Sequence, residues 1–260
     1  MAKVQDSTQH DIARGSFLDG AAPDVHSSSE GYAARFSGSV GAYLLGVQAM
    51  MVLSLIAPWA EAKVLEVGGG HAQLTKALVD AGHDVTVHGS VEACRERPDR
   101  LVGADRYTFL RGPLMKLPAE DNSYDVVVAM RLLAHVQDGP ALVAELCRVA
   151  RKAVIVDFAS TRGANALAPV FYGLKKRLEG NTRHFLMQRP SEVRAMFSDR
   201  GWRCKARRGQ FVLPLAAHRA LKLPGVSRAI EGPPRAIGFT DWLGSPIVMR
   251  AEPDTPASVS

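Results

Sequence analysis

A short apolar stretch that runs directly into three glycines constrains this chain more than any other feature. Residues Lys63–Val67 are typical of a buried β-strand, and glycines follow at positions 68–70. A helix-like segment, Gln73–Ala81, comes next and ends at Gly82. Glycines between a strand and a helix permit unusual backbone angles and let a ligand approach the main chain closely. Free N–H groups at the start of a helix favour anionic or polar ligand groups, so the pattern predicts a nucleotide-type cofactor site.

The spacing of the glycines argues against a dinucleotide cofactor. Gly68 and Gly70 fill the first two positions of the G-x-G-x-x-G fingerprint, but Gln73 stands at the third. The acid that this fingerprint requires at the end of the second strand is also missing, because His88 stands there. A nicotinamide-dependent oxidoreductase is therefore disfavoured. An acid, Glu66, instead precedes the glycines.

The pattern E-x-G-x-G that begins at Glu66 resembles motif I of the class I S-adenosylmethionine-dependent methyltransferases. Leu117 and Pro118 precede the run NSYDVVV at 122–128, which looks like the entry to the fourth strand of that family. Segments 203–212 and 246–250 resemble the antiparallel pair that distinguishes the methyltransferase sheet. The chain is most similar to the small-molecule type 11 branch, which includes ubiquinone and menaquinone methyltransferases.

The resemblance implies an α/β, Rossmann-like class I methyltransferase fold. It implies a mostly parallel seven-stranded sheet with an antiparallel final strand. Four segments are expected along the chain: a disordered tail at 1–28, N-terminal lid or packing helices at 29–62, the methyltransferase domain at 63–251 with an insertion at 160–190 that is a possible substrate cover, and a frayed tail at 252–260.

The cofactor implied by the resemblance is S-adenosyl-L-methionine, and the implied acceptor is a small molecule. The implied cofactor-binding residues are Glu66, Gly68, Gly69, Gly70, His88, Leu114 and Met130. His135 is the candidate catalytic base, because a near-neutral imidazole can take a proton from a hydroxyl or an amine. Each assignment has an alternative: Glu66 stabilises the turn, Met130 is plain core packing, and His135 is a structural hydrogen-bonding residue.

Three positions depart from the family pattern. Ala72 replaces a glycine, His88 replaces the acid that holds the ribose hydroxyls, and Pro113 replaces the Asp that accepts from the adenine amino group. Proline has no N–H and no side-chain acceptor. Losing two contacts of about 1–3 kcal/mol each weakens binding tenfold or more. These departures keep a second hypothesis open, a non-catalytic methyltransferase-fold binding or scaffold protein.

The composition limits the metals, cell compartments and partners that we expect for this chain. The chain has 260 residues with a formal net charge of +6, and its three cysteines form no C-x-x-C pair or cluster with His. We therefore expect one large domain without a metal site, in a reducing cytoplasm. The apolar segment 40–57 contains glycines and a central Gln48, so we expect a packing or lid helix and no membrane insertion. The basic residues at 203–208 lack interleaved aromatic residues, so no nucleic-acid partner is expected, and oligomeric state stays open.

Overall fold

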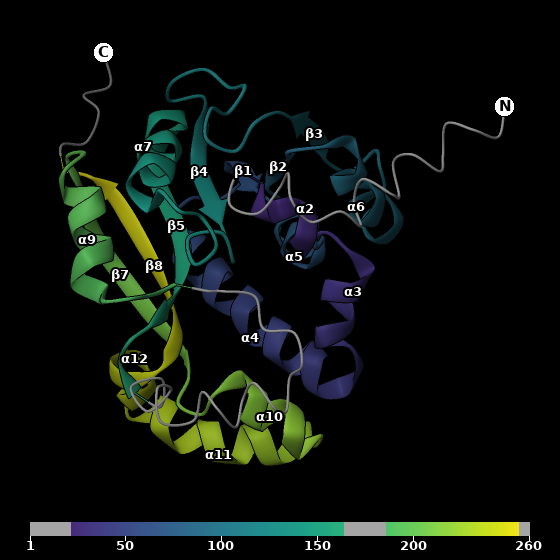
Figure 1. The fold of residues 1–260 in the computed structure, drawn as a ribbon, viewed down its shortest axis with the longest axis vertical. Coiled ribbons are helices and arrows are strands. Elements are labelled where there is room, and N and C mark those ends of the chain that lie inside the picture. Colours follow the sequence, from purple (N-terminus) through teal and green to yellow (C-terminus); the bar gives the residue numbers. More distant parts are fainter. Residues whose placement is uncertain (1–21, 164–185, 255–260) are drawn as a thin grey trace, which may run out of the picture.

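The computed structural model describes residues 22–163 and 186–254. A central sheet has the strand order β3-β2-β1-β4-β5-β8-β7 (Figure 1). Its strands are β1 (Lys63–Val67), β2 (Asp84–Gly89), β3 (Thr108–Arg111), β4 (Tyr124–Ala129), β5 (Ala150–Ser160), β7 (Trp202–Phe211) and β8 (Ser245–Pro253), and a short β6 (Met187–Gln188) pairs with β5. The first five strands run parallel, whereas β8 is antiparallel to both β5 and β7. The predicted fold class is thereby confirmed.

Helices cover both faces of this sheet, as a parallel sheet requires. The N-terminal helices are α2 (Pro23–Ser27), α3 (Glu30–Ala33), the 3-10 turn η1 (Ala34–Phe36) and α4 (Gly38–Ile56). The helices among the first five strands are α5 (Gln73–Asp80), the 3-10 turn η2 (Glu92–Arg95), α6 (Glu96–Leu101) and α7 (Gly139–Val149). Beyond β5 lie α9 (Pro190–Ser198), α10 (Leu215–Leu221), α11 (Pro224–Ala236) and α12 (Phe239–Leu243).

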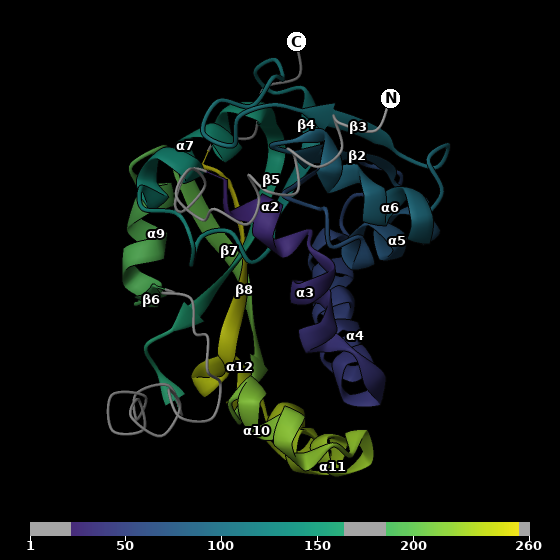
Figure 2. The ribbon, with the colours of Figure 1, turned by 45° about the vertical axis from the view of Figure 1, so that its right-hand side comes forward.

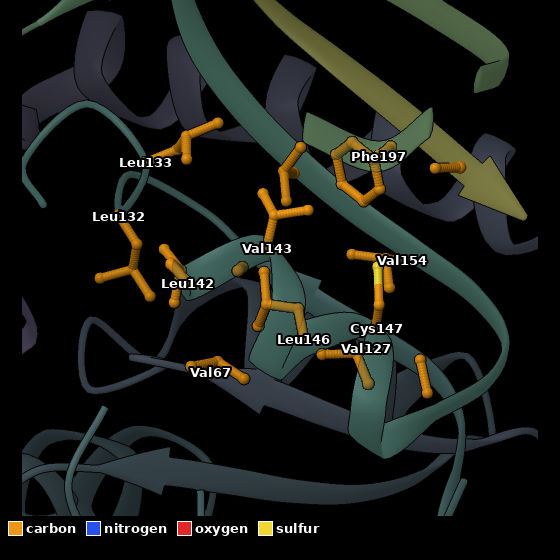
Figure 3. Close-up of a cluster of buried hydrophobic side chains, with 14 of the residues drawn as sticks. Val67, Val127, Leu132, Leu133, Leu142, Val143, Leu146, Cys147, Val154 and Phe197 are labelled. Atoms are coloured by element: carbon orange, nitrogen blue, oxygen red, sulfur yellow. The ribbon is translucent and has the colours of Figure 1, made fainter. Parts of the chain in front are cut away.

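Two apolar clusters hold these layers together, one on each face. On one face α7 and α9 pack against β4 and β5, with Leu146 and Phe197 fully buried among the strand side chains (Figure 3). On the other face α4 and α5 cover the sheet through residues such as Leu55 and Leu78. All six residues of β4 are buried, because the strand has helices on both sides.

Helix α4 is the one helix among the described residues that is long and apolar enough to cross a membrane, judged by length and composition. Half of its most apolar window is buried inside the fold. Its buried residues, including Leu44 and Val52, pack against the sheet layer and against Phe211 of β7. The structure therefore agrees with the expectation that this segment is a packing helix.

Two regions differ from the sequence expectation, and a third lies mostly outside the described residues. The disordered tail predicted at 1–28 extends too far, because Pro23–Ser27 form α2 and Asp24 is fully buried. Most of the insertion predicted at 160–190 lies outside the described residues. Helix α11 was not predicted, because Pro233 and Pro234 near its end are normally signals that stop a helix.

Figure 2 shows β7 and β8 extending beyond their neighbours to reach α10, α11 and α12.

Candidate functional site

The glycine turn lies at the carboxyl end of β1, at the centre of the sheet. The amides of Gly68 and Gly69 both donate to the carbonyl of His88, at 3.0 and 3.3 Å, and this ties the ends of β1 and β2 together. Gly68 has φ +69°, a left-handed conformation that favours glycine. Ala72 also adopts a left-handed φ of +71°, so the residue that departs from the family pattern occupies a position suited to glycine.

The carboxylate of Glu66 lies beneath this turn. Thr75 of α5 donates its hydroxyl to Glu66 Oε2 at 2.6 Å, which connects the end of β1 to the following helix. The side chain is buried, and burial raises the pKa of Glu66 to about 7 despite the hydrogen bond from Thr75. A Cβ at position 69 would lie 2.7 Å from this carboxyl carbon, so only glycine fits over it. Glu66 is therefore a buried acid that is partly ionised near neutral pH.

His71, within the turn, is a site residue that the sequence analysis missed. Its imidazole is buried, and neither ring nitrogen has a hydrogen-bond partner among the described residues. Tyr32 and Phe36 contact the ring edge-on, with centroids 5.9 and 5.7 Å away. Burial, together with the positive charge of Arg131, lowers the pKa of His71 to about 3, so the ring is neutral. Two unused polar nitrogens inside the turn are a strong indication of a ligand site.

A small cavity of about 100 Å³ lies beside Tyr32 and Phe36, the two rings that contact His71. Its polar lining includes Gln48 of α4, Arg131 after β4 and Asp157 of β5. Asp157 accepts from Gln48 Nε2 at 3.2 Å, and Gln48 accepts from Arg131 at 3.2 Å. Its apolar lining includes Phe36 and Phe211. Burial raises the pKa of Asp157 to about 6. This cavity therefore offers a carboxylate that can exchange a proton near neutral pH.

The remaining predicted site residues are spread around this region. His88 is fully buried at the end of β2, bonds through Nε2 to the carbonyl of Gly112 at 2.9 Å, and has its pKa lowered by burial. Leu114 and Met130 are buried in the two apolar clusters on opposite faces of the sheet. His135 is half-buried in the turn after β4 and does not line the cavity. The roles assigned to these four residues stay predictions.

A second missed residue is Asp24 of α2, which the structure inserts at the end of β2. Ser90 donates to its carboxylate twice, through the amide at 2.6 Å and through the hydroxyl at 2.7 Å. The thiol of Cys94 lies 3.7 Å from Asp24 Oδ2. A carboxylate thus stands beside His88, close to where the family carries one. No sequence signal marks it, because the segment around it is polar and short.

These groups suit a nucleoside cofactor more than a metal. The turn offers close access to the main chain, a buried acid and two unpartnered ring nitrogens. No group of three or more metal-ligating side chains occurs in the part of the chain that the structure describes. The glycine turn with Glu66 and His71 therefore suits a cofactor with cationic and hydrogen-bonding groups, such as S-adenosylmethionine.

Comparison with solved structures identifies the fold. The fold matches the magnesium protoporphyrin IX methyltransferase of Synechocystis PCC 6803, solved with bound S-adenosylhomocysteine, with a TM-score of 0.60 and 15% identity over 88% of this chain and 97% of that one. It also matches the [4+2]-cyclase SpnF, with a TM-score of 0.56 and 14% identity over 79% and 80% of the two chains. At such identities the likeness shows the fold alone, and this fold hosts more than one chemistry.

Sequence comparison adds a methyltransferase match over part of the chain. Residues 65–156 match the type 11 family described as "Methyltransferase domain". A 106-residue segment is 28% identical to an O-methyltransferase of Pyrenophora dematioidea, and this match covers 38% of the chain and 39% of that relative's length. The resemblance to class I S-adenosylmethionine-dependent methyltransferases that the sequence indicates is thereby confirmed.

Proposed function

We propose that the protein transfers a methyl group from S-adenosylmethionine to a small-molecule acceptor. The observation that carries the proposal is the buried carboxylate of Glu66 under the glycine turn, in a sheet that ends in the antiparallel pair β7–β8. The cofactor supplies an activated sulfonium methyl. The protein therefore needs mainly to hold two reactants in line, which can lower the barrier by several kcal/mol.

Each group of the site has a distinct task in this proposal. The carboxylate of Glu66 binds the cationic amino group of the cofactor, and the His71 ring meets its polar groups. The cavity beside Arg131 holds the acceptor, with Phe36 and Phe211 against its apolar part. Asp157 takes the proton that an O–H or N–H acceptor releases, because its pKa of about 6 leaves it ionised at pH 7. His135 is the second candidate for this proton.

The test is isothermal titration of the full chain with S-adenosylmethionine and with S-adenosylhomocysteine. We expect micromolar binding of the first, and Glu66→Gln weakens it tenfold or more because the amide keeps the shape of the carboxylate and loses its charge. The exposed Glu120 provides the matched control, Glu120→Gln, which changes the affinity less than twofold. Equal affinities for the wild type and Glu66→Gln would show that Glu66 does not contact the cofactor.

The identity of the catalytic base is tested with a methyl acceptor, which can be sought once cofactor binding is established. Turnover rises as pH increases through about 6 if Asp157 is the base, because only the ionised carboxylate accepts a proton. Asp157→Asn removes that limb of the pH profile, whereas His135→Ala leaves it in place. The opposite pattern would assign the proton to His135.

The second candidate function is a binding or scaffold protein with a methyltransferase fold. His88 and Pro113, which stand where the family carries acids, favour it. Folded protein that binds neither ligand, in wild-type or variant form, would support this alternative. A reducing cytoplasmic location, expected from the three cysteines, is part of the main proposal.

A further inference from the structure

Helix α2 covers the glycine turn at the place where a cofactor would approach it. The hydroxyl of Ser28 lies 1.9 Å from where a Cβ on Gly70 would stand, and Asp24 Cβ lies 3.2 Å from the same point on Gly68. These two glycines are therefore packed against the chain's own α2. Figure 1 shows α2 beside β1 and β2, the strands that end at the turn.

Asp24 also engages the donors at the end of β2. Both donors of Ser90, its amide and its hydroxyl, end on the Asp24 carboxylate at 2.6 and 2.7 Å. Asp24 is fully buried, and Pro23 and Ser27 of α2 are buried as well. A hydroxyl-bearing ligand at the end of β2 would compete with this carboxylate for the same N–H and O–H.

We propose that α2 occupies the nucleoside end of the cofactor site at the glycine turn, and that Asp24 must leave Ser90 before S-adenosylmethionine binds. This inference rests on the proposed function. Asp24 is then a residue that sets the cofactor affinity without contacting the bound cofactor. The apparent affinity of the wild type is lowered by the fraction of molecules in which α2 is docked.

The side-chain hydrogen bonds that join α2 to Ser90 and Cys94 all end on the Asp24 carboxylate. The helix has five residues and no side-chain hydrogen bond at its N-terminal cap. The nearest ion pairs on the following segment join Glu30 to Arg97, at 2.8 Å, and to Arg100. The Glu30 side chain is 64% exposed, so water screens both pairs. Removing the Asp24 carboxylate is therefore expected to release α2, whereas removing Glu30 is not.

The experiment compares S-adenosylhomocysteine binding by the full-length wild type, Asp24→Ala and the control Glu30→Gln. We expect Asp24→Ala to bind at least tenfold more tightly, and Glu30→Gln to stay within twofold of the wild type. Asp24→Asn, which keeps the side-chain shape, gives a smaller increase in the same direction and guards against misfolding of the alanine variant. Equal affinities, or weaker binding by Asp24→Ala, would overturn the proposal, and weaker binding would assign Asp24 to direct ligand contact.

Hydrogen exchange of the wild type gives a second readout that needs no catalytic activity. Saturating S-adenosylhomocysteine is expected to raise deuterium uptake in residues 22–33 while lowering it in residues 66–73. Lower uptake in both segments would overturn displacement, because α2 would then close over the ligand as a lid. Absence of binding by the wild type and all variants overturns the proposed function and this inference together, whereas binding that is insensitive to Asp24 overturns this inference alone.

Discussion

Replacing Glu66 with glutamine should make the ligand-free protein more stable above neutral pH while weakening cofactor binding tenfold or more. Burial holds the pKa of Glu66 at about 7 in the folded protein against an ordinary value of 4.5. At about 1.4 kcal/mol per pH unit, this difference corresponds to about 3 kcal/mol. Because the folded pKa is raised, the folded protein binds this proton more tightly than the unfolded chain does. The associated stability is fully present below pH 4.5 and is lost as pH rises through about 7.

Glutamine at position 66 has no proton to lose, and its amide oxygen still accepts the hydroxyl of Thr75. The assay is urea unfolding of wild type and Glu66→Gln at pH 5 and pH 8, without ligand. We expect the variant to gain about 2–3 kcal/mol relative to wild type between these two pH values. The exposed Glu120→Gln variant should follow the wild type at both. Parallel pH dependence of Glu66→Gln and the wild type would refute the argument that Glu66 is a buried, desolvated acid.

Three further substitutions test the packing around the site by the free energy of unfolding. Ala72→Gly should stabilise the protein by about 1 kcal/mol or less, because Ala72 has a left-handed φ of +71°; a loss of stability would show that its methyl packing outweighs the strain. Glu231→Ala should cost about 3 kcal/mol or more, since its buried carboxylate accepts the amides of Val212 and Leu213 at 2.8 and 2.9 Å and the His218 ring at 3.0 Å. The affinity of the Glu231→Ala variant for the cofactor should not change, and a loss of affinity would show that the hydrogen bonds around Glu231 influence the cofactor site. Truncating the fully buried ring of Phe197 to alanine should cost about 3–5 kcal/mol, and a cost below about 1 kcal/mol would contradict the packing.

The parallel strands could be predicted from sequence because their signal is local. The mostly apolar run Lys63–Val67 forms the predicted strand without a change of bounds, since burial on both faces of the sheet favours apolar side chains. The glycines at 68–70 then fixed the place of the turn. The acid of motif I could be found in the same way, because its spacing from these glycines lies within a few residues.

Helix α11 and the residues that complete the site could not be found in this way. Helix α11 contains prolines that normally stop a helix, and its buried Ser227 and Glu231 bond to the His218 ring of α10 and to the amide of Val212, just after β7. His71 is an ordinary turn residue in sequence, and only its contacts with Tyr32 and Phe36 reveal a buried ring with unused nitrogens.

The sequence alone determined the sheet, the glycine turn and the class of cofactor, because each depends on residues close together in the chain. The tertiary structure decided what surrounds that turn. Asp24 and Ser90 are 66 positions apart, and nothing in the polar segment that contains Asp24 predicts a buried carboxylate. A short helix that is too small to be stable alone is held by contacts with the finished sheet, so its position is a property of the whole fold.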